Sequence, residues 1–128
     1  MRTLSVLLGL LLVAAAGAAG AKRLDYAAYA GEPVPKVNYT RLSNWHRLDD
    51  THLVVWTRPT QAYLLTLGNV CTETAGAVSL HVRATDGMPG VLQAGFGEVI
   101  AGRQHCRVQQ IQPVDLVRMK ADRAAAEG

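Results

Sequence analysis

The segment that decides the fold is HLVVWTRPTQAYLLTL, residues 52–67. Its first part, His52–Thr57, is apolar on both faces of an extended chain, which is typical of a strand inside a sheet. Its last part, Ala62–Leu67, alternates between two side-chain faces, as a half-exposed strand does. Arg58–Gln61 lies between them and contains a proline, so it predicts a turn. The segment therefore predicts two consecutive strands of a β-sheet.

Further short strands are expected on both sides of this segment. In Val78–Arg83, the apolar residues Val78, Leu80 and Val82 alternate with polar ones, which predicts a strand with one face toward water. Thr85–Gly97 contains four glycines and a proline, and this composition predicts a flexible loop. The other predicted strands are Val37–Leu42, Asn44–Leu48, Glu98–Ala101 and Cys106–Gln110.

Helices are expected only near the ends of the chain. Leu24–Ala30 predicts one or two helical turns, and the alternate prolines after it predict an extended connector. Pro113 suits the first turn of a second helix, with Asp115 near the positive end of its dipole. The apolar face of that helix is predicted to contain Val114, Val117 and Ala121. The fold class is therefore mainly β with an α+β fringe: a small antiparallel sheet or barrel with a C-terminal helix.

Residues 1–21 have the pattern of a cleavable signal peptide. Arg2 gives a positive start, Leu4–Val13 is an apolar run too short to cross a bilayer comfortably, and Ala19–Ala21 offers small residues to signal peptidase. An uncleaved membrane anchor over Thr3–Ala21 is the alternative. Cleavage predicts a periplasmic or secreted protein with no stable membrane span.

The remaining chain is large enough for one domain. Removing 21 of the 128 residues leaves 107, which suffices for a single hydrophobic core. We expect residues 22–36 to form the helical turn and the proline-containing connector. Residues 37–128 are expected to form one β-rich domain that includes the C-terminal helix.

The charge of the remaining chain argues against one class of partner. After Arg2 leaves with the leader, 12 basic and 10 acidic residues give a net charge of +2. The basic residues are scattered, with no run longer than Lys22–Arg23. A nucleic-acid surface usually shows a clustered basic stripe, so we expect no nucleic-acid partner.

The only two cysteines, Cys71 and Cys106, are expected to form one disulfide, because exported domains meet an oxidising environment. Such a bond would close a loop of about 36 residues, and the chain-entropy account gives it about 4 kcal/mol of stabilisation as an upper figure. The alternative is a redox-active pair. Its spacing lacks the two-residue separation that tunes thiol reactivity, so we favour a structural bond.

Histidines and aspartates suggest a catalytic or metal-binding alternative. His46 and His52 lie six residues apart across a predicted turn that contains Asp49 and Asp50, so these four residues are the candidate set for a small hydrolase or a metal-dependent enzyme. Neighbouring aspartates at a turn usually bond to their own backbone. The other two histidines, His81 and His105, lie in separate predicted strands and show no ligand spacing. We therefore expect solvated histidines and no metal or other cofactor.

Aromatic residues suggest a binding surface. Trp45, Trp56 and Tyr63, together with Arg58, would form a platform for a partner if they were exposed on one face of the sheet. Packing in the core is the alternative, because large aromatic side chains are usually buried in a domain of this size.

Several blocks of sequence resemble a known family. These blocks are Trp45–Leu48, Val55–Pro59, Gln61–Leu65 with Cys71, Cys106–Ile111 and Pro113–Asp115. They resemble the domain-of-unknown-function family numbered 6491, which consists of small exported proteins of Gram-negative bacteria. The resemblance covers most of the chain after the leader and is less clear over Ala84–Gln104. It implies an exported domain with paired cysteines and implies no activity, cofactor or catalytic residue.

Two functions from different classes follow. The first is an exported periplasmic module, non-catalytic, that binds an envelope protein or another periplasmic component, with Trp45, Trp56, Arg58 and Tyr63 as its surface. The second is the small hydrolase or metal-binding enzyme described above. Convergence of the histidines and aspartates in a cleft would favour the enzyme, and their dispersal would favour the binding module.

Overall fold

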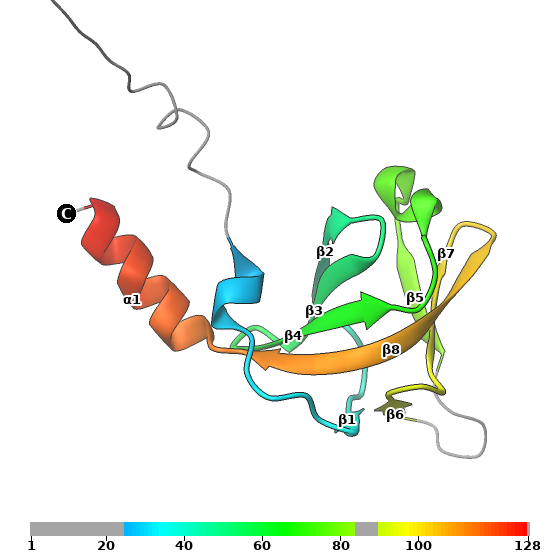
Figure 1. Ribbon diagram of the computed structural model, residues 1–128, viewed down its shortest axis with the longest axis horizontal. Helices are drawn as coiled ribbons and strands as arrows, with labels where there is room; N and C mark the ends of the chain where they lie inside the picture. The colour runs from blue at the N-terminus through cyan, green and yellow to red at the C-terminus, as the bar shows by residue number, and fades with distance from the viewer. Residues whose placement is uncertain (1–24, 84–89, 128) are drawn as a thin grey trace, which may run out of the picture.

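The computed structural model describes residues 25–83 and 90–127, and the predicted leader lies outside them. Eight strands, two short 3-10 helices and one α-helix form a curled sheet with a helix at one end (Figure 1). The predicted class, mainly β with a C-terminal helix, is confirmed. In chain order the elements are η2 (Tyr26–Tyr29), β1 (Lys36–Asn38), β2 (Asn44–Asp49), β3 (His52–Arg58), β4 (Gln61–Leu67), η3 (Thr72–Gly76), β5 (Leu80–Arg83), β6 (Val91–Gln93), β7 (Glu98–Ala101), β8 (Gln104–Val114) and α1 (Leu116–Glu127).

The main sheet has six antiparallel strands in the order β2-β3-β4-β8-β7-β5. The predicted pair His52–Thr57 and Ala62–Leu67 becomes β3 and β4, with Leu53 opposite Leu65. Strand β8 joins the two halves of the sheet, because its first residues pair with β7 and its later residues pair with β4. Figure 1 shows β8 as the long curved strand that carries this curl.

The inner face of the curled sheet holds the larger hydrophobic core. Leu53, Leu65 and Val108 are fully buried there. The small ribbon of β1 and β6 lies against this core, with Val37 opposite Leu92 in its register. A fully buried aliphatic side chain contributes roughly 1.5–3 kcal/mol, so this cluster is the main source of stability.

A second, smaller core covers one half of the outer face. Val54 and Leu64, on the outer side of β3 and β4, pack with Tyr26 of η2 and Met119 of α1. Figure 1 shows η2 and α1 together at the end of the sheet that is remote from β5 and β7. Neither η2 nor α1 covers the outer face of β5, β7 and the first part of β8.

Two side-chain contacts link the edges of the curled sheet. Arg47 of β2 donates from Nε to the hydroxyl of Thr74 in η3, at 3.1 Å. Tyr39, which follows β1, donates its hydroxyl proton to the carbonyl of Val82 in β5, at 3.3 Å. The first contact attaches η3 to β2, and the second attaches the segment after β1 to β5. Strands β2 and β5 are the two end strands of the sheet and do not pair with each other.

The predicted C-terminal helix begins later than expected. Pro113 belongs to β8, where its carbonyl accepts a hydrogen bond from Gly31 N–H at 2.8 Å. Strand pairing therefore continues through the proline, which itself needs no N–H partner. Asp115 caps the helix instead, because its carboxylate accepts the Arg118 N–H at 3.0 Å. The predicted helical face is wrong: Val117 is 81% exposed, and Met119 is the buried residue.

Strand boundaries also differ from the prediction. Strand β1 ends at Asn38, and β5 begins only at Leu80, which leaves Val78 99% exposed. Strand β6, Val91–Gln93, lies inside the segment predicted as a flexible loop. Pairing with β1 stabilises it, and that partner is distant in sequence.

No helix within residues 25–83 and 90–127 has both the length and the apolar character that a membrane crossing requires.

Candidate functional site

The four residues of the enzyme hypothesis do not form one site. Asp49 lies 3.0 Å from Nδ1 of His52, while Asp50 turns away and forms an ion pair with Arg47. His46 lies on the outer face, and its ring is 6.2 Å from that of Tyr26. No group of three or more histidine, cysteine, aspartate or glutamate side chains is placed to hold a metal ion in the described part of the chain.

The contacts of His52 also differ from those of a catalytic triad. The Thr51 hydroxyl lies 2.9 Å from Nδ1 of His52, the same nitrogen that faces Asp49. In a triad the acid and the nucleophile lie on opposite ring nitrogens. The three side chains therefore form a turn cap at the β2–β3 connection, in which Asp49 also accepts the Thr51 N–H at 2.8 Å.

This cap determines the acidity of Asp49. Burial acts to raise the pKa of Asp49, but the hydrogen bonds from Thr51 and His52 stabilise the carboxylate and lower the pKa from 3.8 to about 2. A group with so low a pKa is a weak general base at neutral pH. The carboxylate of Asp49 is thus suited to capping the turn.

The aromatic residues of the binding hypothesis lie on two faces of the sheet. Trp45 and Tyr63 flank Val55 in the register of β2, β3 and β4, so they belong to the inner face. Trp56 belongs to the outer face, where its ring meets that of Tyr26 edge-on at 5.9 Å. Each tryptophan is partly buried against a different core. They do not form one platform.

Arg58, the fourth predicted residue, lies at the end of β3 and is exposed. It lines a surface groove of about 410 Å³. Asn38, Tyr39, Thr40, Thr57, Gly90 and Val91 line the groove with it. None of the seven lining residues is acidic, and Arg58 forms no ion pair with another described residue.

Backbone contacts define one wall of the groove. Tyr39 N–H donates to the carbonyl of Gly90 at 2.8 Å. Gly90 has a φ of +83°, and a Cβ at this position would lie 3.2 Å from the Tyr39 carbonyl oxygen. A side chain at Gly90 would therefore be strained and would also crowd the groove. The sequence indicated Arg58 only, because all the other lining residues except Thr57 come from the segments that pair through β1 and β6.

The groove lies beside a small apolar space lined mainly by residues of the inner core. That space measures about 10 Å³, enough for about one water molecule, and it shares Tyr39 and Thr57 with the groove. Burial raises the pKa of Tyr39 above 10.0, so its hydroxyl stays protonated and donates to Val82. A ligand in the groove would lie at the surface, against a lining that is mostly polar.

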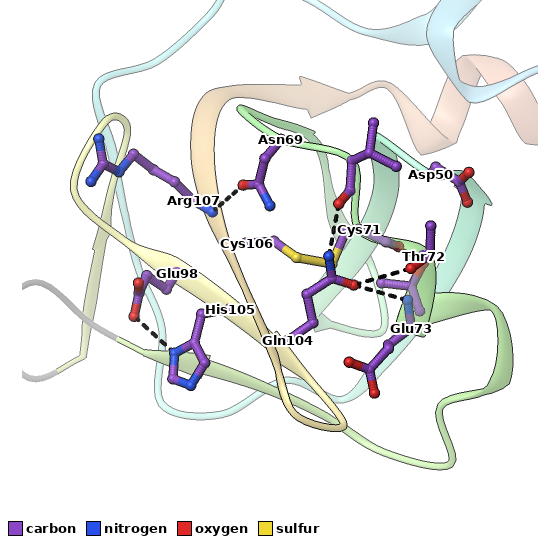
Figure 2. Close-up of a disulfide and its surroundings, with 12 residues drawn as sticks. Asp50, Asn69, Cys71, Thr72, Glu73, Glu98, Gln104, His105, Cys106 and Arg107 are labelled. Carbon is purple, nitrogen blue, oxygen red and sulfur yellow. Dashed lines mark hydrogen bonds and ion pairs between the residues drawn. A yellow bond between two sulfur atoms is a disulfide. The ribbon is translucent and has the colours of Figure 1, made fainter.

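The predicted disulfide is confirmed and is deeply buried. Cys71 and Cys106 are both 0% exposed, with their Cα atoms 6.0 Å apart. Figure 2 shows Gln104 beside the bond, where its amide bridges two segments. The Gln104 amide donates to the Val70 carbonyl at 2.8 Å and accepts the Glu73 N–H at 3.0 Å. Such burial keeps other thiols away from the sulfur atoms and indicates a structural bond.

Comparison with known proteins gives one match. The family described as "Family of unknown function (DUF6491)" matches residues 1–128, the whole chain. No curated protein and no solved structure matches it.

Proposed function

The chain belongs to the DUF6491 family of unknown function. We propose that it is an exported, non-catalytic periplasmic binding protein that takes an anionic ligand in the groove around Arg58. The observation that carries the proposal is the exposed Arg58, which forms no ion pair with another described residue and lies among seven lining residues of which none is acidic. A guanidinium group binds carboxylates and phosphates in a bidentate manner. The hydroxyls of Thr40 and Thr57 and the amide of Asn38 supply further hydrogen-bonding groups around it.

Export is supported by two features. Residues 1–21 have the pattern of a cleavable leader. The Cys71–Cys106 bond is typical of proteins that fold in an oxidising compartment. Their combination supports the periplasm as the site of action.

The shape of the groove suggests how a ligand would bind. Its volume of about 410 Å³ falls within the range of small-molecule sites. One exposed guanidinium and a few neutral polar groups predict weak binding of a simple anion, in the millimolar range. A natural ligand would gain affinity by adding contacts to Val91 and the ring of Tyr39.

The test is a titration of ¹⁵N-labelled protein, purified from the periplasm, with inorganic phosphate and with acetate. We expect residue-specific shifts of the amide signals at Thr57, Arg58 and Val91. The variant Arg58→Gln should lose these shifts. Lys120→Gln removes one positive charge from the exposed face of α1 and should keep them.

Uniform small shifts over the whole chain, unaffected by Arg58→Gln, would contradict the anion site. Cell fractionation with mass measurement tests export separately. We expect periplasmic material that lacks residues 1–21. A full-length chain held in the membrane would instead support the uncleaved anchor.

A further inference from the structure

Two similar sequence triplets, with the same first and third residues, lie on either side of β7. His81-Val82-Arg83 is in β5 and His105-Cys106-Arg107 is in β8, so each strand carries a histidine and an arginine two residues apart. Because side chains alternate along a strand, the histidine and the arginine of each triplet share a face. Val82 and Cys106, the middle residues, point to the inner core.

The register aligns these triplets into two rows across the sheet. Arg83 lies opposite Glu98, and Glu98 lies opposite Arg107. In the next row, Ile100 lies between His81 and His105. We call these six residues of the outer face the HxR face: His81, Arg83, Glu98, Ile100, His105 and Arg107.

Glu98 is the single acidic member of the HxR face. Its carboxylate lies 3.8 Å from a guanidinium nitrogen of Arg83 and 3.5 Å from Nδ1 of His105. Figure 2 shows Glu98 and His105 turned toward each other, on the side of the strands away from the disulfide. Two arginines and one glutamate leave a net charge of +1 with neutral histidines, and protonation of both histidines raises it to +3.

The HxR face is open to its surroundings. Its histidines and arginines are all exposed, and the packing of η2 and α1 covers the other half of the outer face. Neighbouring strands are about 4.8 Å apart, so the backbones of Arg83 and Arg107 are separated by about 10 Å. None of the six residues lines the groove around Arg58.

We propose that the HxR face is a docking surface for an anionic lipid bilayer, with its arginines and histidines on lipid phosphate groups. Stable protein partners need an apolar interface core, and the HxR face has only Ile100 at its centre. Adsorption to an anionic bilayer depends mainly on positive charge. Each basic residue that reaches the surface raises the affinity about fivefold. The composition of the face thus matches a lipid surface better than a protein.

Binding should strengthen under mild acidity. Histidine side chains in general gain their charge between about pH 8 and pH 5. The charged groups that face His81 and His105 within the described residues are Glu98, Arg83 and Arg107. Any positive charge that the histidines gain adds to the HxR face, so the affinity for anionic vesicles should be higher at pH 5.5 than at pH 7.5.

The experiment is co-sedimentation of the periplasmic protein with vesicles of phosphatidylglycerol and phosphatidylethanolamine in equal parts. Vesicles of phosphatidylcholine alone and soluble polyglutamate are the comparison ligands. We expect binding to the anionic vesicles only, with strong weakening by added salt. Arg83→Gln and Arg107→Gln should each lower the affinity about fivefold, and Glu98→Gln should raise it by a similar factor at pH 7.5.

Matched variants separate this surface from total charge and from the groove. Lys120→Gln and Arg58→Gln remove the same charge elsewhere and should leave vesicle binding unchanged. Equal losses in all four charge-removal variants would overturn the proposal, as would absence of vesicle binding at both pH values. Polyglutamate binding as tight as vesicle binding would also overturn it, in favour of an acidic protein partner. Thermal unfolding of each variant confirms that these exposed substitutions leave the fold intact.

Discussion

The guanidinium of Arg47 in β2 donates to the hydroxyl of Thr74, 27 residues away, at 3.1 Å. Thr74 is 2% exposed, and its own hydroxyl donates a hydrogen bond to the carbonyl of Cys71 at 2.9 Å. This chain of bonds connects one free edge of the sheet to the segment that carries the disulfide. It holds η3 against β2, beside the main-chain hydrogen bond from Cys71 N–H to the Asp50 carbonyl at 2.6 Å.

Loss of this connection should weaken the domain. Arg47→Met keeps an aliphatic stem of similar length but removes the hydrogen bond to Thr74 and the ion pair with Asp50. Because Arg47 and Asp50 are both partly exposed, we expect a loss of about 1 kcal/mol in the free energy of unfolding. Urea denaturation measures it, with Arg58→Met as the exposed control. Equal stability of Arg47→Met and the parent would contradict the bridging role.

The disulfide should carry a larger share of stability. Replacing both Cys71 and Cys106 by alanine removes the cross-link, and we expect a loss of up to about 4 kcal/mol. Native protein alkylated without reduction should show no added mass, because both sulfur atoms are in the buried bond. Two alkylated thiols in periplasmic material would contradict this assignment.

Gly97 should not tolerate a side chain. A Cβ at Gly97 would meet the side chain of Leu92, which is 3% exposed and belongs to the inner core. We expect Gly97→Ala to lower the free energy of unfolding by about 1–3 kcal/mol through overpacking. The control is Gly76→Ala, because no atom lies within 4 Å of a Cβ built there. Similar denaturation midpoints for both variants would contradict the prediction, because the Leu92 side chain would then move aside at little cost in stability.

Asp49 should give the stability a dependence on acid pH. Its pKa of about 2 in the folded chain lies below the value of 3.8 for a free side chain. The stabilisation is therefore fully present above about pH 4 and is lost as the pH falls toward about 2. Asp49→Asn should flatten this region of the stability curve. Since the Asp49 side chain is 60% exposed, solvent screening limits the effect at neutral pH to less than about 1 kcal/mol.

The measurement is the denaturant midpoint of both proteins at several pH values between about 7 and 2. Asp50→Asn is the matched control, because Asp50 bonds to Arg47 and not to the turn. If Asp49→Asn leaves the slope of the midpoint against pH unchanged, or if Asp50→Asn changes that slope equally, the turn cap is not the source of the pH dependence.

Local patterns predicted the elements well where neighbours in sequence are also neighbours in the sheet. Strands β3 and β4 follow from the alternation and the turn in residues 52–67, since a short connection forces the two strands together. Strand β6 was not predicted, because its strand partner in the described residues is the distant β1 and its three residues lie in a glycine-rich segment. The extension of β8 through Pro113 depends on Gly31, which is 82 residues earlier in the chain.

Residue types predicted the candidate groove only in part. Arg58 was visible as a charged residue at a turn, next to Thr57 in β3, but the other groove residues lie in or beside β1 and β6, which are distant from Arg58 in sequence. Trp45 and Trp56 were equivalent in the sequence, whereas the register sends them to opposite faces. A count of aromatic residues cannot contain this information.

By itself, the sequence determined the secondary-structure class, the strand–turn–strand segment and the pairing of the only two cysteines. These follow from local periodicity, turn chemistry and the absence of any other thiol. Only the tertiary structure decided which face each side chain occupies and which distant strands align. The two histidine–arginine triplets, 24 residues apart, become one surface because β7 pairs with both of their strands in the same register. Such long-range pairing depends on the packing of the whole sheet, which no local pattern encodes.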